Sequence, residues 1–313
     1  MMMDILIAVV LDLLIGDPPN WPHPVRLIGR IITGLEKWIR KTFVNLKIGG
    51  FVLLICTVFA VVTPLVLINV MIPPPFLRII NIYLLYCALA CKSLWNEANK
   101  VKKYLKRQDL VGARKQLAMI VGRDTEHLEE GDIVRGVVET VSENTVDGIL
   151  SPLFYMLIGA PLGISLYLAW IFKAVSTLDS MVGYKQLHYA DIGYASAKTD
   201  DFLNLIPARL GAVMLILSGL FLKLDVKSGI TVFLRDRKNH DSPNSAHPES
   251  AVAGLLGIQL GGTNHYFGKS VYKPTIGTPT MALKVTHIDL AIKLAVVSEC
   301  LLLAAAWMTA SIV

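Results

Sequence analysis

The sequence is poor in charge and in cysteine. Charged residues make up 17% of the 313 residues and hydrophobic residues 54%, whereas average globular domains carry about 25% charged residues. The mean hydropathy of +0.55 excludes an ordinary soluble domain. The cysteines all lie in or next to apolar stretches, which favours buried small side chains over a disulfide framework or a metal cluster. They are Cys56, Cys87, Cys91 and Cys300.

Standard nucleotide-binding loops are also missing. Gly268-Lys269-Ser270 resembles the end of a P-loop, but Thr263 stands where that motif requires its first glycine, and no G-x-G-x-x-G occurs. A cleavable signal peptide is excluded as well, because the first apolar stretch has no basic segment before it and no small-residue cleavage site. The net charge of +6 does not indicate nucleic-acid binding, since the basic residues cluster in the loops between apolar stretches.

Long apolar runs are abundant and predict an all-α, polytopic transmembrane helical bundle with amphipathic cytoplasmic helices and long functional loops. We expect one membrane-embedded domain over residues 1–313. Candidate spans lie near 3–16, 48–72, 74–91, 149–172, 203–222 and 287–313, and polar loops at 17–47, 92–148, 173–202 and 223–286. The first span is short and carries Asp4 and Asp12, so it is either tilted or only partly inserted.

The positions of lysine and arginine predict the orientation in the membrane. The basic segments 26–47, 92–135 and 235–238 are expected in the cytoplasm, with an outer turn at Pro73–Pro75. A single crossing by 149–172 would put the polar segment 173–201 outside. A re-entrant hairpin broken at the glycines and proline of 159–163 is the alternative, and both remain open.

The most informative stretch is residues 122–152, where carboxylates crowd into an otherwise apolar chain. On a helix, Glu139, Glu143 and Asp147 stack on one face at i,i+4 spacing, opposite a face of isoleucine and valine. Like charges at this spacing cost about 0.2–0.5 kcal/mol per pair, so a cation is expected to meet them. One interpretation is a Mg²⁺ site, with Asn144 and Asp124 as further oxygen ligands. The other is a salt-bridge network with Arg123 or Arg135.

Three further polar motifs each allow a functional and a structural interpretation. GDPPNWPHPVRLIGR (16–30) is either a membrane-interface anchor or a rigid loop that presents Asp17 or His23 to a cleft. KAVSTLDSMVGYK (173–185) is either a charged interfacial pairing or part of the catalytic apparatus. TDD at 199–201 fits a plain helix N-terminus.

The segment 235–270 is the best candidate for anion capture. It begins with Arg235, Arg237 and Lys238, continues into a small-residue helix with Glu249 in its first turn, and reaches the Gly261-Gly262 pair. Guanidinium groups and unhindered backbone amides suit phosphate. The alternative is a solvated basic loop that only fixes the membrane topology.

Taken in order, six strings resemble the CbiB/CobD family: GDPPNWPHPVRLIGR, GRDTEHLE, ETVSENTVDGILSPLFY, KAVSTLDSMVGYK, IPARL and SPNSAHPESAVAGLLGIQLGG. The resemblance covers nearly the whole chain. It implies a multi-pass protein of the cell membrane that acts as an adenosylcobinamide-phosphate synthase, joining adenosylcobyric acid to aminopropanol phosphate or a related amino alcohol phosphate at the expense of ATP. Ser176 and His247 depart from the family pattern, which weakens any role for those two residues.

Amide formation requires that the carboxylate be activated before an amine can displace one of its oxygens. We combine this requirement with the family resemblance in one hypothesis. The hypothesis assigns a role to each candidate residue. Proton transfer and catalysis fall to Glu249, Asp179 and Lys185. Substrate and phosphate binding fall to Arg235, Arg237, Lys238, Asn244, Asn264, Arg26 and Arg123. Binding of Mg²⁺ falls to Asp124, Glu139, Glu143, Asn144 and Asp147.

ATP is expected as a substrate with Mg²⁺, and the corrinoid is a substrate, so no prosthetic group is expected. Expected partners are the two substrates, the lipid bilayer and other cobalamin-assembly enzymes of the membrane, and the active loops are expected to face the cytoplasm. Two alternatives stay open. One is a transporter, and the other is a scaffold or signalling protein like the AmpE-like relatives.

Overall fold

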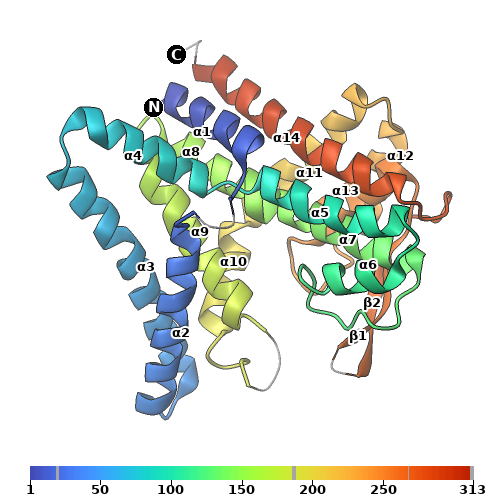
Figure 1. Ribbon diagram of the computed structural model, residues 1–313, viewed down its shortest axis with the longest axis horizontal. Coiled ribbons are helices and arrows are strands. Elements are labelled where there is room, and N and C mark those ends of the chain that lie inside the picture. The colour runs from blue at the N-terminus through green and yellow to red at the C-terminus, as the bar shows by residue number, and fades with distance from the viewer. Residues whose placement is uncertain (19–20, 185–187, 267, 311–313) are drawn as a thin grey trace. The chain divides into compact units, whose positions relative to one another are not determined.

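A computed structural model describes residues 1–18, 21–184, 188–266 and 268–310 of the chain. As predicted, it is a helical membrane protein. Its elements group into two compact units, which we describe separately: unit 1 comprises Met1–Ala90 and Ser151–Asn204, and unit 2 comprises Cys91–Leu150 and Leu205–Val313. Figure 1 labels the elements of both.

Unit 1 is made of helices packed around α9. Its elements are α1 (Met2–Ile15), α2 (Pro24–Thr42), α3 (Leu46–Met71), α4 (Pro74–Cys87), α8 (Ser151–Gly159), α9 (Ser165–Val182) and α10 (Tyr194–Leu203). Helix α9 contacts α2, α3, α8 and α10, and its Trp170 and Phe172 are buried. Two helices begin at side-chain caps, His23 for α2 and Asn45 for α3.

Two described helical segments, Leu46–Met71 and Pro74–Lys106, are long and apolar enough to cross a membrane. They confirm the predicted spans near 48–72 and 74–91. A third crossing is possible if α10 and the following helix α11 (Leu205–Phe221) count as one broken span. The predicted span 3–16 is a helix of only 14 residues, about 21 Å long at 1.5 Å per residue, which is short for a bilayer core of about 30 Å.

Residues 149–172 do not form one continuous helix, so of the two alternatives that the sequence leaves open the structure agrees with the segment broken at 159–163. Helix α8 ends at Gly159 and α9 starts at Ser165, and the two helices pack against each other. A methyl group on Gly159 would lie 2.7 Å from the Ser165 backbone, and the Ser165 hydroxyl donates to the Met156 carbonyl at 2.7 Å. The break therefore occurs where glycine and proline predict it. Helix α9 continues through Lys173 to Val182, so the start of the predicted loop 173–202 is helical.

The TDD motif does not start a helix. Asp200 and Asp201 lie in the last turns of α10. Asp200 accepts a hydrogen bond at 3.0 Å from the side-chain amide of Asn204, the residue that follows the helix. The prediction took these aspartates for an N-terminal turn, but the helix begins earlier, at Tyr194, and the next one begins directly after Asn204.

Unit 2 surrounds a core of aliphatic side chains with helices and one hairpin. Its elements are α5 (Cys91–Lys106), α6 (Leu110–Leu117), α7 (Glu130–Thr145), the π-helical turn η1 (Val146–Leu150), α11, α12 (Val226–Asp236), α13 (Ala246–Leu256), β1 (Leu260–Tyr266), β2 (Lys269–Ile276) and α14 (Thr286–Ala310). Helix α7 contacts α5, α6, α13 and α14. Helix α14 covers most of the predicted span 287–313, but it is not among the described helices that are long and apolar enough to cross a membrane.

The expected faces of α7 are confirmed. Its apolar face is at most 1% exposed and lies in the core. This face consists of Ile133, Val134, Val137, Val138 and Val141. Asp109 caps α6, since it accepts from the backbone N–H of Gly112 at 2.8 Å. The polar helix α7 does not end at Gly148, because the helical backbone continues through η1 into α8.

The segment 223–286 is not a structureless loop. It folds into α12, α13 and the antiparallel β1–β2 hairpin, whose register pairs Thr263 with Tyr272. A bulge interrupts the pairing at Leu260–Gly262, where Gly261 has φ of 77°. A side chain on Gly261 would lie 2.3 Å from the Pro274 carbonyl oxygen. The close approach of the two strands therefore requires glycine at this position.

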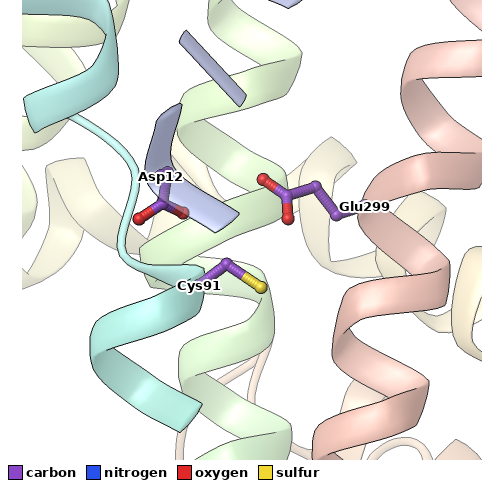
Figure 2. A group of neighbouring side chains, drawn as sticks. All are labelled: Asp12, Cys91 and Glu299. Carbon is purple, nitrogen blue, oxygen red and sulfur yellow. The ribbon is translucent and has the colours of Figure 1, made fainter. Parts of the chain in front are cut away.

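Unit 2 also buries two polar side chains on its long helices. Cys91 begins α5 and Glu299 lies on α14, and the Cys91 Sγ lies within 4.8 Å of a Glu299 carboxylate oxygen (Figure 2). Cys91 is 2% exposed and Glu299 is fully buried. Cys91 thus agrees with the expectation of a buried small side chain, whereas Cys300, the next residue along α14, is exposed.

Candidate active site

A polar cavity of about 150 Å³ lies inside unit 2, between α7, the start of α13 and the β1–β2 hairpin. This volume suits a phosphoryl-sized group and is far too small for a corrinoid. Its charged or ionisable lining residues are Arg123, Glu139, Glu143, His240, Glu249, Tyr266 and Lys273. Asn144 also lines it. Five of the predicted site residues therefore meet here: Arg123, Glu139, Glu143, Asn144 and Glu249.

Glu139 is held by groups from both sides. Its Oε1 accepts from the backbone N–H of Gly261 at 2.8 Å, and its Oε2 forms an ion pair with Arg123. Arg123 also donates to the Asn264 side chain. The unhindered amide at Gly261 thus binds an anion, as the glycine pair suggests, but the anion is the protein's own carboxylate. Of the two interpretations of the carboxylate stripe, the salt bridge with Arg123 is present at Glu139.

Glu143 lies one turn further along α7. Its Oε1 accepts from the Ser245 hydroxyl at 2.8 Å, which ties α7 to the residue that precedes α13. Glu249, in the first turn of α13, is 6% exposed and lines the same cavity. Three glutamates from two helices therefore converge on one small space.

Burial raises the pKa of Glu249 well above its usual range. The negative charges of Glu139 and Glu143 raise this pKa further. The positive charges of Lys273 and Arg123 act in the opposite direction but do not offset these effects. Glu249 is therefore protonated more readily than an exposed glutamate, and any cation that enters the cavity favours its ionised form.

Lys273 and His240 line the cavity although the sequence did not single them out. Burial acts to lower the pKa of Lys273, but the charges of the neighbouring acidic groups prevail and raise it, so the ammonium group is charged. Burial and the charge of Lys273 lower the pKa of His240. The His240 Nδ1 accepts from the Ser242 backbone N–H at 3.0 Å, which leaves the hydrogen of the neutral ring on Nε2.

Seven predicted residues of unit 2 are not among the residues that line this cavity, and four of them are Arg235, Arg237, Lys238 and Asp124. Arg235 forms an ion pair at 2.7 Å with Asp236, which also accepts from the Gly277 backbone N–H at 2.8 Å. Arg237 lies 5.8 Å over the Phe233 ring, and Lys238 is exposed. Asp124 accepts from the Gly268 backbone N–H at 2.8 Å and so fixes the hairpin turn.

The other predicted residues are placed as follows. Asp147 lies in η1, away from the cavity lining, and Asn264 contacts the cavity through Arg123. Asn244 is buried and accepts from Arg209 at 3.1 Å. Asp179, in the last turn of α9, and Arg26, in the first turn of α2, belong to unit 1. Lys185 lies outside the described residues.

The polar turn before α2 pairs its own side chains. His23 Nε2 lies 3.1 Å from the Asp17 carboxylate, and His23 Nδ1 accepts from the Val25 backbone N–H at 3.3 Å. Trp21 is 48% exposed. These contacts agree with the interpretation of this motif as a structural anchor.

The donor set of the cavity fits a divalent hard cation. Mg²⁺ prefers oxygen ligands, typically one or two carboxylates together with substrate phosphates. Glu139, Glu143 and Asn144 present carboxylate and amide oxygens, and Glu249 adds a third carboxyl group. Lys273 and Arg123 supply positive charge for a phosphoryl or carboxylate group of a substrate. Metal binding stays a prediction for these residues.

Comparison with known proteins identifies the relatives. The CobD/Cbib protein family matches residues 5–295. The cobalamin biosynthesis protein CobD of Clostridium perfringens is 50% identical over 292 residues, 92% of this chain and 91% of that protein. CobD of Geobacter metallireducens is 46% identical over 97% of this chain and 96% of its own length.

Cobalamin biosynthesis protein CbiB of Salmonella paratyphi B is 45% identical over 95% of this chain and 94% of its own length. No solved structure is significantly similar to the chain. Because the family match and these identities cover nearly the whole sequence, the chain belongs to the CobD/Cbib protein family.

Proposed function

We propose that this chain acts in cobalamin biosynthesis as an adenosylcobinamide-phosphate synthase. It joins the carboxylate of adenosylcobyric acid to the amine of aminopropanol phosphate, or a related amino alcohol phosphate, with consumption of ATP. The observation that carries the proposal is the convergence of three glutamates with Lys273 and Arg123 around one small cavity. This set can screen phosphate charge and move a proton, which are the two tasks that amide formation from a carboxylate requires.

In the proposal, Glu139, Glu143 and Asn144 hold Mg²⁺, which supplies charge screening for the phosphates of ATP. Lys273 and Arg123 face the negative charge that develops on the reacting carboxylate and phosphoryl oxygens. The position of Arg123 is fixed from two directions, since it donates to both Glu139 and Asn264. The corrinoid ring stays outside the cavity because of its size, and only the reacting groups enter.

Glu249 is the proposed proton acceptor for the attacking ammonium group. An amine must lose a proton before it can attack, and a carboxylate with a raised pKa is a stronger base than an exposed one. Entry of the positive ammonium group into a cavity with three glutamates favours the ionised form of Glu249. The Glu249 carboxylate can then accept the proton as the amine nitrogen bonds to the acyl carbon, while the bond from that carbon to the phosphate oxygen of the ATP-activated carboxylate breaks and phosphate leaves.

The test is incubation of the purified full chain, in detergent or lipid nanodiscs, with adenosylcobyric acid, aminopropanol phosphate and Mg–ATP. Mass spectrometry is expected to detect adenosylcobinamide phosphate, and product is expected to be absent when ATP or Mg²⁺ is left out. The proposal is wrong if folded protein forms no product with all components present.

A further inference from the structure

A second polar cluster lies in unit 2 on the other side of the start of α13. Ser245 and Glu249, which are four residues apart, face the cavity, whereas His247 lies about 200° around the helix from Ser245 at 3.6 residues per turn. Around His247 stand Arg209 from α11, Arg237 from the end of α12, and Asn244. The N-terminal turn of α13 therefore separates an acidic cavity from a basic cluster.

Direct contacts join the members of this cluster. Arg209 Nη1 donates to the Asn244 side-chain oxygen at 3.1 Å and to the Leu205 carbonyl at 2.6 Å. The Phe233 ring contacts both of the other two, with its centroid 5.9 Å from that of His247 and 5.8 Å from the Arg237 guanidinium carbon. Asn244 is 6% exposed and His247 3% exposed, whereas Arg209 and Arg237 are half-buried. The cluster thus joins two buried polar side chains to two half-buried arginines.

Among the residues that the structure describes, the cluster has positive charge without a matching negative charge. In the part of the chain that the structure describes, neither Arg209 nor Arg237 forms an ion pair with an acidic side chain. Burial lowers the pKa of His247 to about 4, and the positive charges of both arginines contribute to this shift. His247 is therefore neutral at physiological pH, and its buried Nδ1 has no hydrogen-bond partner among the described residues.

We infer that Arg209, Arg237, Asn244 and His247 form a second binding site, distinct from the carboxylate cavity, that takes a phosphoryl group. Two guanidinium groups supply the forked donors that bind phosphate oxygens, and the start of α13 adds the positive end of its dipole. An entering phosphoryl group balances the arginine charges and gives the His247 ring a partner. Under the proposed function, the phosphate belongs either to the amino alcohol phosphate or to ATP.

This assignment differs from the phosphate-binding set that the sequence suggests. Arg235 is paired with Asp236, and Lys238 is exposed. Arg209, which lies earlier in the chain in the apolar helix α11, replaces Arg235 and Lys238 in the phosphate-binding set. The family pattern does not favour a role for His247. We therefore assign the binding of the phosphoryl group to the two arginines, and His247 only lines the site.

Binding without turnover tests the inference. The purified full chain is titrated calorimetrically in EDTA with three probes: aminopropanol phosphate, ATP and phosphate-free aminopropanol. Arg209→Ala and Arg237→Ala are expected to weaken binding of a phosphate-bearing probe about tenfold or more. Lys227→Ala, an exposed lysine on the same helix α12, is the charge-matched control and is expected to stay within twofold. The probe whose affinity falls identifies the source of the phosphate.

The inference is overturned if the wild-type chain binds neither phosphate-bearing probe, or if both arginine variants bind them as the wild type does. Thermal unfolding reports whether each variant is folded, and Arg237→Ala serves if Arg209→Ala is not. The proposed function fails separately, through absence of amide product in the synthesis assay. If binding depends on the arginines but no product forms, the proposed function is wrong and the binding site is still supported. If product forms but the variants have unchanged KM values for both phosphate substrates, the binding site is wrong and the proposed function is still supported.

Discussion

The two faces of the first turn of α13 collect opposite charges. On one face, Glu139, Glu143 and Glu249 surround a cavity in which Lys273 and Arg123 supply counter-charge. On the other face, Arg209 and Arg237 lie around a neutral histidine without an acidic partner among the described residues. In the described part of the chain, the acidic face contains charges of both signs, whereas the basic face contains positive charge alone. The difference indicates that the acidic face manages charge during a reaction, whereas the basic face binds an anion from outside.

Removing a carboxylate from the cavity is expected to have the largest effect. Glu143→Gln and Glu249→Gln should each lower the rate of amide synthesis by about 100-fold or more, because one loses a metal ligand and the other the proton acceptor. Glu130→Gln, an exposed position in the first turn of α7, is the control. Full activity in either cavity variant would remove the carboxylates from the mechanism.

A change in the hairpin tests whether the cavity needs its backbone wall. Gly261→Ala places a methyl group 2.3 Å from the Pro274 carbonyl and displaces the amide that binds Glu139. We expect a loss in unfolding free energy of about 2–3 kcal/mol, measured by thermal or denaturant unfolding. Gly268→Ala also has positive φ but meets open space, so it should cost only about 1–2 kcal/mol. Equal losses in the two variants would contradict the close approach.

Replacement of Lys273 tests whether its positive charge offsets the negative charges of the cavity glutamates. Lys273→Ala removes a charge that opposes the rise in the Glu249 pKa, so amide synthesis should fall about tenfold and the acid limb of its pH–rate profile should move to higher pH. Lys269→Ala, at the exposed start of the same strand, is the matched control. An unchanged profile in Lys273→Ala would show that this lysine does not act on Glu249.

Replacement of Arg235 tests whether this arginine also belongs to the phosphate-binding cluster. Its ion pair holds Asp236 in place. Burial acts to raise the pKa of Asp236, but the hydrogen bonds from Arg235 and from the Gly277 backbone N–H prevail and lower it. Arg235→Ala should therefore reduce stability by about 1 kcal/mol while KM values for phosphate substrates stay within twofold. Because the sequence assigned this arginine to phosphate, a KM rise as large as that of Arg209→Ala would restore the sequence-based assignment.

The smallest expected effect is a pH dependence of stability from His247. Its pKa is about 4 in the folded chain and about 6.5 when unfolded. Between pH 4 and 6.5 the unfolded chain binds a proton there that the folded chain does not, so stability rises with pH over this window. A His247→Leu variant should show a flatter dependence of melting temperature on pH. Parallel curves for variant and wild type would contradict a buried neutral imidazole.

The sequence predicted those features of unit 2 that depend on residues close together in the chain. The apolar face of α7, the Asp109 cap and the position of Glu249 in a first helical turn all follow from helical periodicity and capping chemistry. Glu139 and Glu143 share one helix face, so their convergence was also readable. Each of these features is decided within a few turns of one helix.

The rest depends on contacts between distant segments, which periodicity does not encode. Arg123 and Asn264 meet across 141 positions, and Lys273 reaches the cavity from a hairpin hidden in a segment rich in glycine, proline and asparagine. The glycine pair suggested anion capture, but only the fold shows that Gly261 captures Glu139. Arg209 was visible as a charge in an apolar helix, but its pairing with Asn244 requires the packing of α11 against α13.

The most direct test of the central claim is a density map of the full chain in lipid nanodiscs with Mg²⁺, a non-hydrolysable ATP analogue and aminopropanol phosphate. The account predicts ligand density in the cavity beside Glu139, Glu143 and Lys273, with a phosphoryl group at Arg209 and Arg237. Ordered ligands elsewhere in the chain, with only water beside the three glutamates, would contradict it.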